Sequence, residues 1–335
     1  MRKCLLFVSF ALLLLCLCSC ELITQAQYGK PAYTKINLLV YGNDYSVTKY
    51  NGKEIKLNYT VNDATQVGLA LEALAQKTGI ECEATYVTGK NYTKKGGYST
   101  IQNVPESKSD HDTTKSHFRT LMNDLANRSA DSELTIIYFS CHGFNNSIFT
   151  EKKEYGSKSS TSFAMCANSS ANETLEFYTH DEFKTDLAKV KGTKVVFADV
   201  CYSGGLIESS NVAVNPNEYT DIDAATLFWN YQVNQDPSTF YLSACRYYEQ
   251  SYEPLREHGV FTAVLLDALG WDEEAQKIAT PATLGSDGHT LTFFSIAQYA
   301  VQNTKSSSTY PQNPMLSNAS NDVILFNNID IYRNM

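Results

Sequence analysis

The chain has 335 residues, of which 43% are hydrophobic and 19% charged, and its formal net charge at pH 7 is −9. The hydrophobic fraction is large enough for a substantial core, which excludes a mostly disordered protein. The acidic balance excludes a general nucleic-acid binder, because binding to phosphates requires an excess of Lys and Arg. No repeat and no Pro/Gly-rich linker divides the sequence, so we expect one domain.

Residues 1–20 have the pattern of a secretory signal peptide. Arg2 and Lys3 form a basic start, and residues 4–17 are an almost unbroken apolar run. This run is shorter than the roughly 20 apolar residues that a membrane-spanning helix needs. A signal peptide is therefore the better interpretation, and we expect an exported protein.

The end of this segment, Leu17-Cys18-Ser19-Cys20, resembles the bacterial lipobox, in which a cysteine is lipidated and becomes the new N-terminus. We expect Cys20 to carry the lipid and to anchor the protein in the membrane of the cell envelope. Ordinary signal cleavage nearby, which would give a secreted protein, is the alternative. Residues 21–35 are polar and predict a tether, and residues 36–335 predict the folded domain.

Short apolar runs alternate with helical patterns through the domain. Val67, Leu71 and Leu74, for example, have the spacing of one apolar helix face. This alternation predicts an α/β domain built on a doubly wound, mainly parallel sheet. The expected elements are strands at 36–41, 82–87, 134–140, 194–200, 240–244 and 322–326, helices at 62–79, 118–125, 183–190 and 260–269, and a long surface loop at 88–115.

One histidine and one cysteine follow predicted strands directly. Cys141-His142-Gly143 comes after the strand at 134–140, and Cys201 comes after the strand at 194–200. The carboxyl ends of parallel strands meet at one edge of a sheet, where such folds hold their sites. A thiol becomes a good nucleophile when a base takes its proton and donors stabilise the oxyanion. We therefore predict Cys201 as nucleophile and His142 as its base.

Two further features bear on this prediction. His258 is a rival base, which we rank below His142 because it leads into the turn at Gly259. After the leader, five cysteines remain, so at least one thiol is free unless it pairs between chains. No Cys/His cluster has the spacing of zinc ligands, and we predict no metal site.

Around these residues the sequence resembles the caspase-like cysteine peptidases, most closely the metacaspase and bacterial caspase-homologue branch. The blocks that carry the resemblance are Tyr-Phe-Ser-Cys-His-Gly at 138–143 and Asp-Val-Cys-Tyr-Ser-Gly-Gly at 199–205. Segments similar to other parts of the family occur in the same order, at 38–45, 61–64, 242–262 and 310–314. The resemblance implies the caspase–haemoglobinase fold, with a mainly parallel sheet of about six strands and helices on both faces.

The resemblance also implies a mechanism on peptide or protein substrates. Cys201 would attack the peptide carbonyl and His142 would handle the proton. The backbone N–H groups of Gly143 and Cys201 would hold the oxyanion, and water would hydrolyse the thioester. The family needs no organic cofactor. Some metacaspases require calcium, but we identify no matching calcium site in this sequence.

Cleavage after Arg or Lys is the expected specificity. Asp199 lies two residues before Cys201, where metacaspases with this preference have Asp, and Asp63 matches the second acid of the family's S1 pocket. Carboxylates there would pair with a guanidinium or ammonium group. Asp63 has a competing interpretation as a helix cap. Glu249 or Glu253 would replace or reinforce the pair.

Two residues depart from the family pattern. Cys141 stands where the family usually has Gly, so it would crowd the site or add a second thiol. Arg246 would neutralise part of an acidic pocket. Residues 206–245, where caspase relatives are often cut, contain no Lys or Arg. A protease that cuts after basic residues would therefore remain a single chain.

Two alternatives stay open at this stage. One is a non-catalytic caspase-like lipoprotein that binds peptides or partner proteins at the cell surface. The other is a caspase-like peptidase with a different P1 preference.

Overall fold

The computed structural model describes residues 32–45, 49–50, 52–89, 109–145, 161–166, 175–207, 236–317 and 322–329. The expected signal segment 1–20, its Cys20 and most of the tether 21–35 lie outside these residues, as does most of the segment 206–245. Within the described part of the chain, no helix has both the length and the apolar character needed to cross a membrane.

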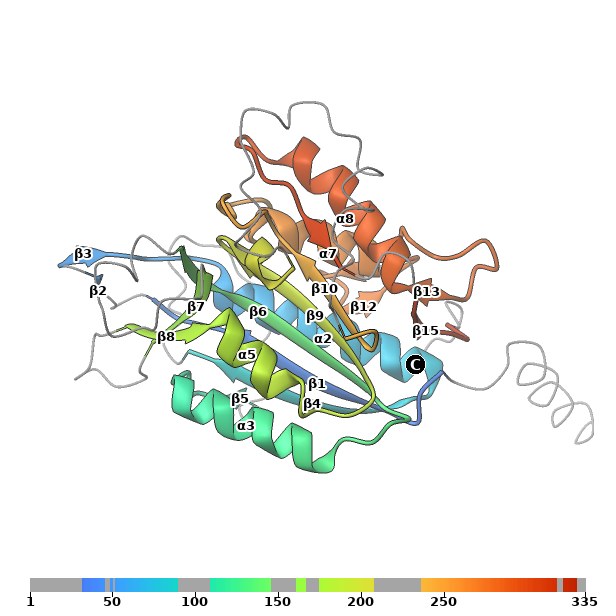
Figure 1. The fold of residues 1–335 in the computed structure, drawn as a ribbon. Helices are drawn as coiled ribbons and strands as arrows, with labels where there is room; N and C mark the ends of the chain where they lie inside the picture. The colour runs from blue at the N-terminus through green and yellow to red at the C-terminus, as the bar shows by residue number, and fades with distance from the viewer. Residues whose placement is uncertain are drawn as a thin grey trace, which may run out of the picture.

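The centre of the molecule is a mostly parallel sheet with strand order β14-β10-β9-β6-β1-β4-β5 (Figure 1). The pairing is parallel from β10 to β5, and β14 closes the other edge in the antiparallel direction. This confirms the expected α/β fold of the caspase type. The strands are β1 (Lys35–Gly42), β4 (Glu81–Thr88), β5 (Ser109–Asp110), β6 (Leu134–Asn145), β9 (Thr193–Val200), β10 (Thr239–Ser243) and β14 (Met315–Leu316).

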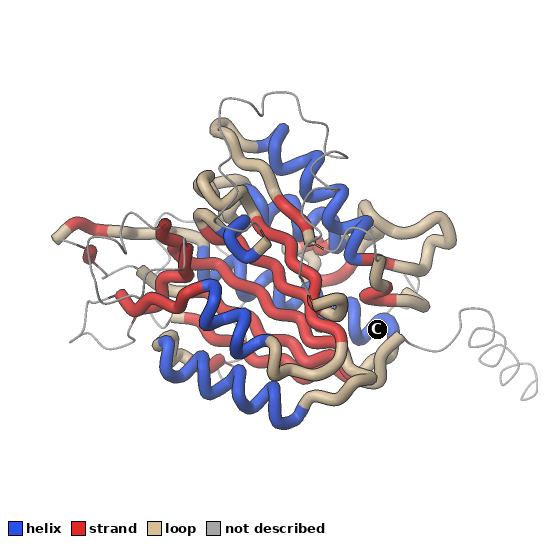
Figure 2. The backbone as a smooth tube through the Cα atoms, viewed as in Figure 1, coloured by secondary structure: helices blue, strands red, loops and turns tan. Residues whose placement is uncertain are grey.

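Helices cover both faces of this sheet (Figure 2). One face packs against α2 (Thr60–Thr78), α7 (Val260–Leu269) and α8 (Phe293–Ser307), and the other against α3 (Lys115–Arg128) and α5 (His180–Leu187). Alternate strand residues supply the two cores: Leu38 belongs to the first and Leu39 to the second. Because both faces are buried, the central strands are mostly apolar, with few polar residues such as Asn37, Lys194 and Asp199, which explains why they are recognisable in the sequence.

The short elements lie at the ends of the sheet and beside it. β7 and β8 extend β6 as an antiparallel arm, and three small two-stranded sheets lie outside the central one. Their bounds are β2 (Lys49–Tyr50), β3 (Lys53–Glu54), β7 (Thr161–Cys166), β8 (Leu175–Thr179), β11 (Trp271–Asp272), β12 (Lys277–Ile278), β13 (Leu291–Thr292) and β15 (Ile324–Phe326), with one 3₁₀ turn, η1 (Ser203–Leu206).

Several sequence expectations need correction. β6 does not end at residue 140 but continues through His142, because its last residues pair with β7. The strand expected at 322–326 is β15, which pairs with β13 outside the central sheet. Helix α8 was not predicted, although Phe293, Ile296, Ala297 and Ala300 have helical spacing and are all buried.

A buried carboxylate fastens the helices of one face together. Asp186 of α5 accepts hydrogen bonds from Arg119 Nε of α3 at 2.8 Å, Tyr178 Oη at 2.8 Å and Lys189 Nζ at 2.8 Å. Burial acts to raise the pKa of Asp186, but the hydrogen bonds from Lys189, Arg119 and Tyr178 outweigh it and hold the pKa below its usual value. The ionised form therefore stabilises the fold.

We expect Asp186→Asn to lower the free energy of unfolding by about 2 kcal/mol at neutral pH. A lowered pKa gives a stabilisation that is present above the unfolded-state value of about 3.9 and is lost as pH falls through the folded-state value. The difference from the wild type should therefore shrink below about pH 4. Urea unfolding at several pH values measures it, with the exposed Asp181→Asn as control. Equal losses in both variants would contradict the role of Asp186.

Candidate active site

The strand register brings Cys201 and His142 to one edge of the sheet. In the parallel pair β6–β9, Ser140 lies opposite Asp199 and Cys141 opposite Val200. His142 and Cys201 directly follow these paired residues. Because neighbouring strands lie about 4.8 Å apart, the backbones of the two residues lie close together.

Only glycine at position 143 lets the backbones of the two sequence blocks come this close. A Cβ atom at Gly143 would collide with the carbonyl oxygen of Cys201 and lie 2.8 Å from its carbonyl carbon. The backbones of the two sequence blocks are thus in direct contact.

The His142 ring is fixed by contacts on two sides. Its Nε2 makes a hydrogen bond with the carbonyl oxygen of Ile55, and its ring lies edge-on to Tyr45 with centroids 4.5 Å apart. The His142 N–H donates to Tyr45 Oη at 3.0 Å. Since Nε2 donates to a carbonyl, Nδ1 of the neutral ring is an acceptor. Burial lowers the pKa of His142, against the effect of the Ile55 bond, so the ring is neutral at pH 7.

The Cys201 thiol is also neutral in this structure. It donates to the Ser251 carbonyl oxygen at 3.6 Å. Burial raises the pKa of Cys201 to about 11, and the charge of Asp199 adds to this. Contacts of the sulfur with the backbone at Ser251, Gly143 and Cys201 itself act in the opposite direction but do not outweigh burial.

Asp199 is buried behind this edge and is held by neutral donors. Ser251 Oγ donates to its Oδ1, and Thr262 donates to Oδ2 from the backbone N–H at 3.1 Å and from Oγ1 at 2.6 Å. Burial, and then the charge of Asp63, raise the pKa of Asp199 to about 6. A Cβ atom at Gly259 would collide with this carboxylate, so glycine there is required for the approach.

Asp63 is buried beside Asp199 but has different partners. It accepts hydrogen bonds from Ser140 Oγ at 2.8 Å and from the Gly259 N–H at 3.2 Å, and pairs with His258 Nδ1 at 2.8 Å. The helix-cap interpretation is wrong, because the N-cap of α2 is Tyr59 and Asp63 lies inside the first turn.

The other sequence-predicted acids do not share this arrangement. Both carboxylate oxygens of Glu249 accept hydrogen bonds from neighbouring residues. Oε1 accepts from Asn313 Nδ2 at 2.6 Å, and Oε2 accepts from the Arg246 N–H at 3.2 Å. Glu253 accepts from the Asn58 N–H at 2.9 Å. Burial raises the pKa of Glu253 to about 7, and the charges of Asp63 and Asp199 add to the rise.

Arg246 and Cys141, the two residues that depart from the family pattern, are both buried. Nη1 of Arg246 donates to Tyr248 Oη at 3.0 Å. Cys141 lies in the apolar core of the α3–α5 face, because side chains alternate along β6 and that of Cys141 points away from His142. Among the residues that the structure describes, no group of three or more His, Cys, Asp or Glu side chains is arranged to hold a metal ion.

Sequence reasoning missed Tyr45, Ser251 and Gln312. Gln312 Nε2 donates to Ser251 Oγ at 3.2 Å, and its Oε1 accepts from the Tyr252 N–H at 3.1 Å. Gln312 thus holds the segment that contacts both Cys201 and Asp199. All three lie inside or beside the family-like blocks, which was the available signal, but their roles depend on contacts between distant segments.

The fold and the residues at this sheet edge define the class of protein. It is a mainly parallel α/β domain with a histidine and a cysteine side by side where the pairing of β6 with β9 ends. A family model described as the caspase domain matches residues 38–325. The chain therefore belongs to the caspase-domain family, which is a family of cysteine-type peptidases.

The crystal structure of protein GSU0716 from Geobacter sulfurreducens is similar to this chain at 15% identity, covering 84% of this chain and 92% of that one, with a TM-score of 0.47. A search of the curated proteins found no match.

A thiol with a pKa near 11 reacts slowly at neutral pH, because only the thiolate is nucleophilic. We expect alkylation of Cys201 by iodoacetamide to accelerate by about tenfold per pH unit between about pH 7 and 9. Mass spectrometry of the Cys201 peptide measures the rate, and Cys201→Ala confirms the assignment. A rate already constant at neutral pH would show instead that the thiolate is formed in the free protein.

Proposed function

We propose that this protein is a cysteine endopeptidase in which Cys201 is the nucleophile and His142 its base. The observation that carries the proposal is the β6–β9 register, which brings the two residues to one sheet edge with Gly143 packed on the Cys201 backbone.

The mechanism starts from the neutral pair. His142 Nδ1 takes the thiol proton as Cys201 attacks the peptide carbonyl, and the Ile55 carbonyl stabilises the imidazolium through Nε2. The N–H groups of Gly143 and Cys201 hold the oxyanion. His142 then protonates the leaving amine, and water hydrolyses the thioester. Transfer within a neutral pair avoids a permanent charge in a buried site.

The specificity that we propose is for Arg or Lys at P1. Two carboxylates, Asp199 and Asp63, are buried in this part of the protein. In the described part of the chain, the hydrogen-bond donors to Asp199 are all neutral, so a guanidinium or ammonium group would supply its missing counter-charge. Glu249 makes no contribution in this proposal, since both its oxygens bind other groups.

We also propose that the enzyme is exported, tethered by a lipid on Cys20, and active as a single chain. The signal-like segment 1–20 and the absence of Lys and Arg from residues 206–245 support these points. A non-catalytic peptide-binding protein is the competing function, because the caspase-domain family includes inactive members.

Hydrolysis of fluorogenic peptides with Arg, Lys, Asp or Asn at P1 tests the activity. We expect turnover of the Arg and Lys peptides, and a loss of at least about 1,000-fold in Cys201→Ala and in His142→Ala. Cys82→Ala, on the outer strand β4, is the matched control. Absence of Cys201-dependent turnover of every peptide, with and without calcium, would favour the binding protein. Intact mass of the same preparation reports whether the chain is whole.

The raised pKa of Asp199 predicts how specificity depends on pH. Below its pKa of about 6 the carboxyl is neutral and does not attract a cation. The ratio of kcat/KM for P1 Arg to that for P1 citrulline, its neutral analogue, should rise with pH through about 6 and level off. Asp199→Asn should lower this ratio about 100-fold and abolish the rise. A ratio independent of pH in the wild type would contradict the assignment.

A further inference from the structure

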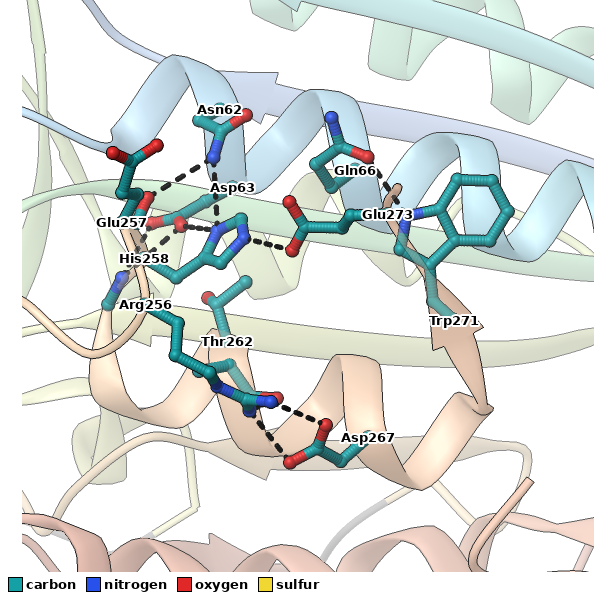
Figure 3. Close-up of polar contacts among 12 residues, drawn as sticks. Asn62, Asp63, Gln66, Arg256, Glu257, His258, Thr262, Asp267, Trp271 and Glu273 are labelled. Atoms are coloured by element: carbon teal, nitrogen blue, oxygen red, sulfur yellow. Dashed lines mark hydrogen bonds and ion pairs between the residues drawn. The ribbon is translucent and has the colours of Figure 1, made fainter. Parts of the chain in front are cut away.

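His258 is buried, and its ring lies between the carboxylates of Asp63 and Glu273 (Figure 3). Its Nδ1 is 2.8 Å from Asp63 Oδ1, and its Nε2 is 2.5 Å from Glu273 Oε1. A neutral imidazole can donate from only one nitrogen, whereas both nitrogens here face acceptors. With both carboxylates ionised, the geometry favours the imidazolium form, which donates from both nitrogens, in a side chain that is 1% exposed. The Asn62 Nδ2 group also lies 3.5 Å from Nδ1.

A tight turn aims this side chain inward. Leu255 and His258 are joined by two backbone hydrogen bonds, and the residues between them, Arg256 and Glu257, have φ angles of 52° and 65°. This left-handed conformation costs energy in residues other than glycine. Asn62 Nδ2 offsets the cost by donating to the Glu257 carbonyl at 3.1 Å. The same segment of α2 thus supplies Asp63 and holds the turn that presents its partner.

Further anchoring comes from α7. The guanidinium of Arg256 binds the carboxylate of Asp267 with two hydrogen bonds, of 2.9 and 2.7 Å, and donates to the Ala263 carbonyl at 3.0 Å (Figure 3). The position of His258 is therefore fixed from both helices that flank it. A strained turn held in this way indicates that the location of the cation matters.

The two buried acids consequently differ in charge compensation. Asp63 has a cation against it, while the partners of Asp199 among the residues that the structure describes are the hydroxyl groups of Ser251 and Thr262 and one backbone N–H. Two neighbouring buried carboxylates disfavour each other's ionised form, and the charge of Asp63 contributes to the raised pKa of Asp199. A fixed cation on Asp63 weakens that repulsion.

We propose that His258 is a positioning residue that offsets the charge of Asp63 and leaves Asp199, which has no cationic partner among the described residues, as the member of the pair that meets the P1 cation. This inference rests on the proposed function. It assigns Asp63 a contact with His258 rather than with substrate. Burial acts to lower the pKa of His258, but Asp63 and Glu273 outweigh it and raise the pKa to about 9, which keeps the ring charged at neutral pH.

A double-mutant comparison tests the proposal. In Asp63→Asn, His258 keeps Glu273 but loses one of its two carboxylate partners. The surroundings of Asp199 then become more positive by one charge, so the kcat/KM ratio for P1 Arg over P1 citrulline should fall by about tenfold or more. Adding His258→Gln removes the imidazolium cation, and the double variant should return to within about fivefold of the wild-type ratio. A double variant no better than Asp63→Asn would overturn the proposal, because Asp63 would then contact the substrate itself.

A second measurement does not depend on turnover. Histidine chemical shifts of the Cys201→Ala protein, assigned with His258→Gln, should show a charged His258 at pH 7, and a neutral ring would overturn the proposal. Thermal unfolding of each variant separates misfolding from the effect on the ratio, because misfolding lowers kcat/KM for both peptides equally. If the wild type has no Cys201-dependent turnover, the proposed function and this inference fall together; a wild type that cleaves but a double variant that does not recover removes only the inference.

Discussion

The parallel pairing of β6 with β9 is the constraint on which the candidate site depends. Hydrogen bonds along the two strands fix their register, so Ser140 lies beside Asp199 and the next residues along each chain follow. A slip of one residue would turn His142 to the opposite face of the sheet. Both faces of these strands are covered by helices and packed with apolar side chains, which makes such a slip costly. The rigidity of the core is therefore what positions the site.

The same edge carries an unusual amount of buried charge. Asp63, Asp199 and His258 are each less than about a tenth exposed, and they are stable only because every one is hydrogen-bonded. Their partners come from α2, from the segment 251–262 and from β6. These contacts connect three parts of the chain that are far apart in sequence. Apolar packing and polar contacts thus both hold this edge of the sheet together.

The neutral state of Cys201 and His142 follows from the same burial. Removing water raises the pKa of the thiol and lowers that of the imidazole, since both shifts disfavour charge. In the proposed mechanism, such a pair reacts only when a substrate carbonyl offers a place for the negative charge. The backbone N–H groups of Gly143 and Cys201 would hold that charge there, a form of preorganisation that favours a transition state over a ground state.

The sequence alone determined the fold class and the placement of His142 and Cys201 at one edge of the sheet, because apolar runs buried on both faces are recognisable as strands and parallel strands end at one edge. It did not reveal that β6 continues through His142, since that extension depends on pairing with β7. Nor did it show that Glu249 binds Asn313, or that Asp63 faces His258 while Asp199 faces Thr262. Only the tertiary structure decided these partners, because hydrogen bonds between residues nearly 200 positions apart depend on how helices and loops pack and leave no local pattern.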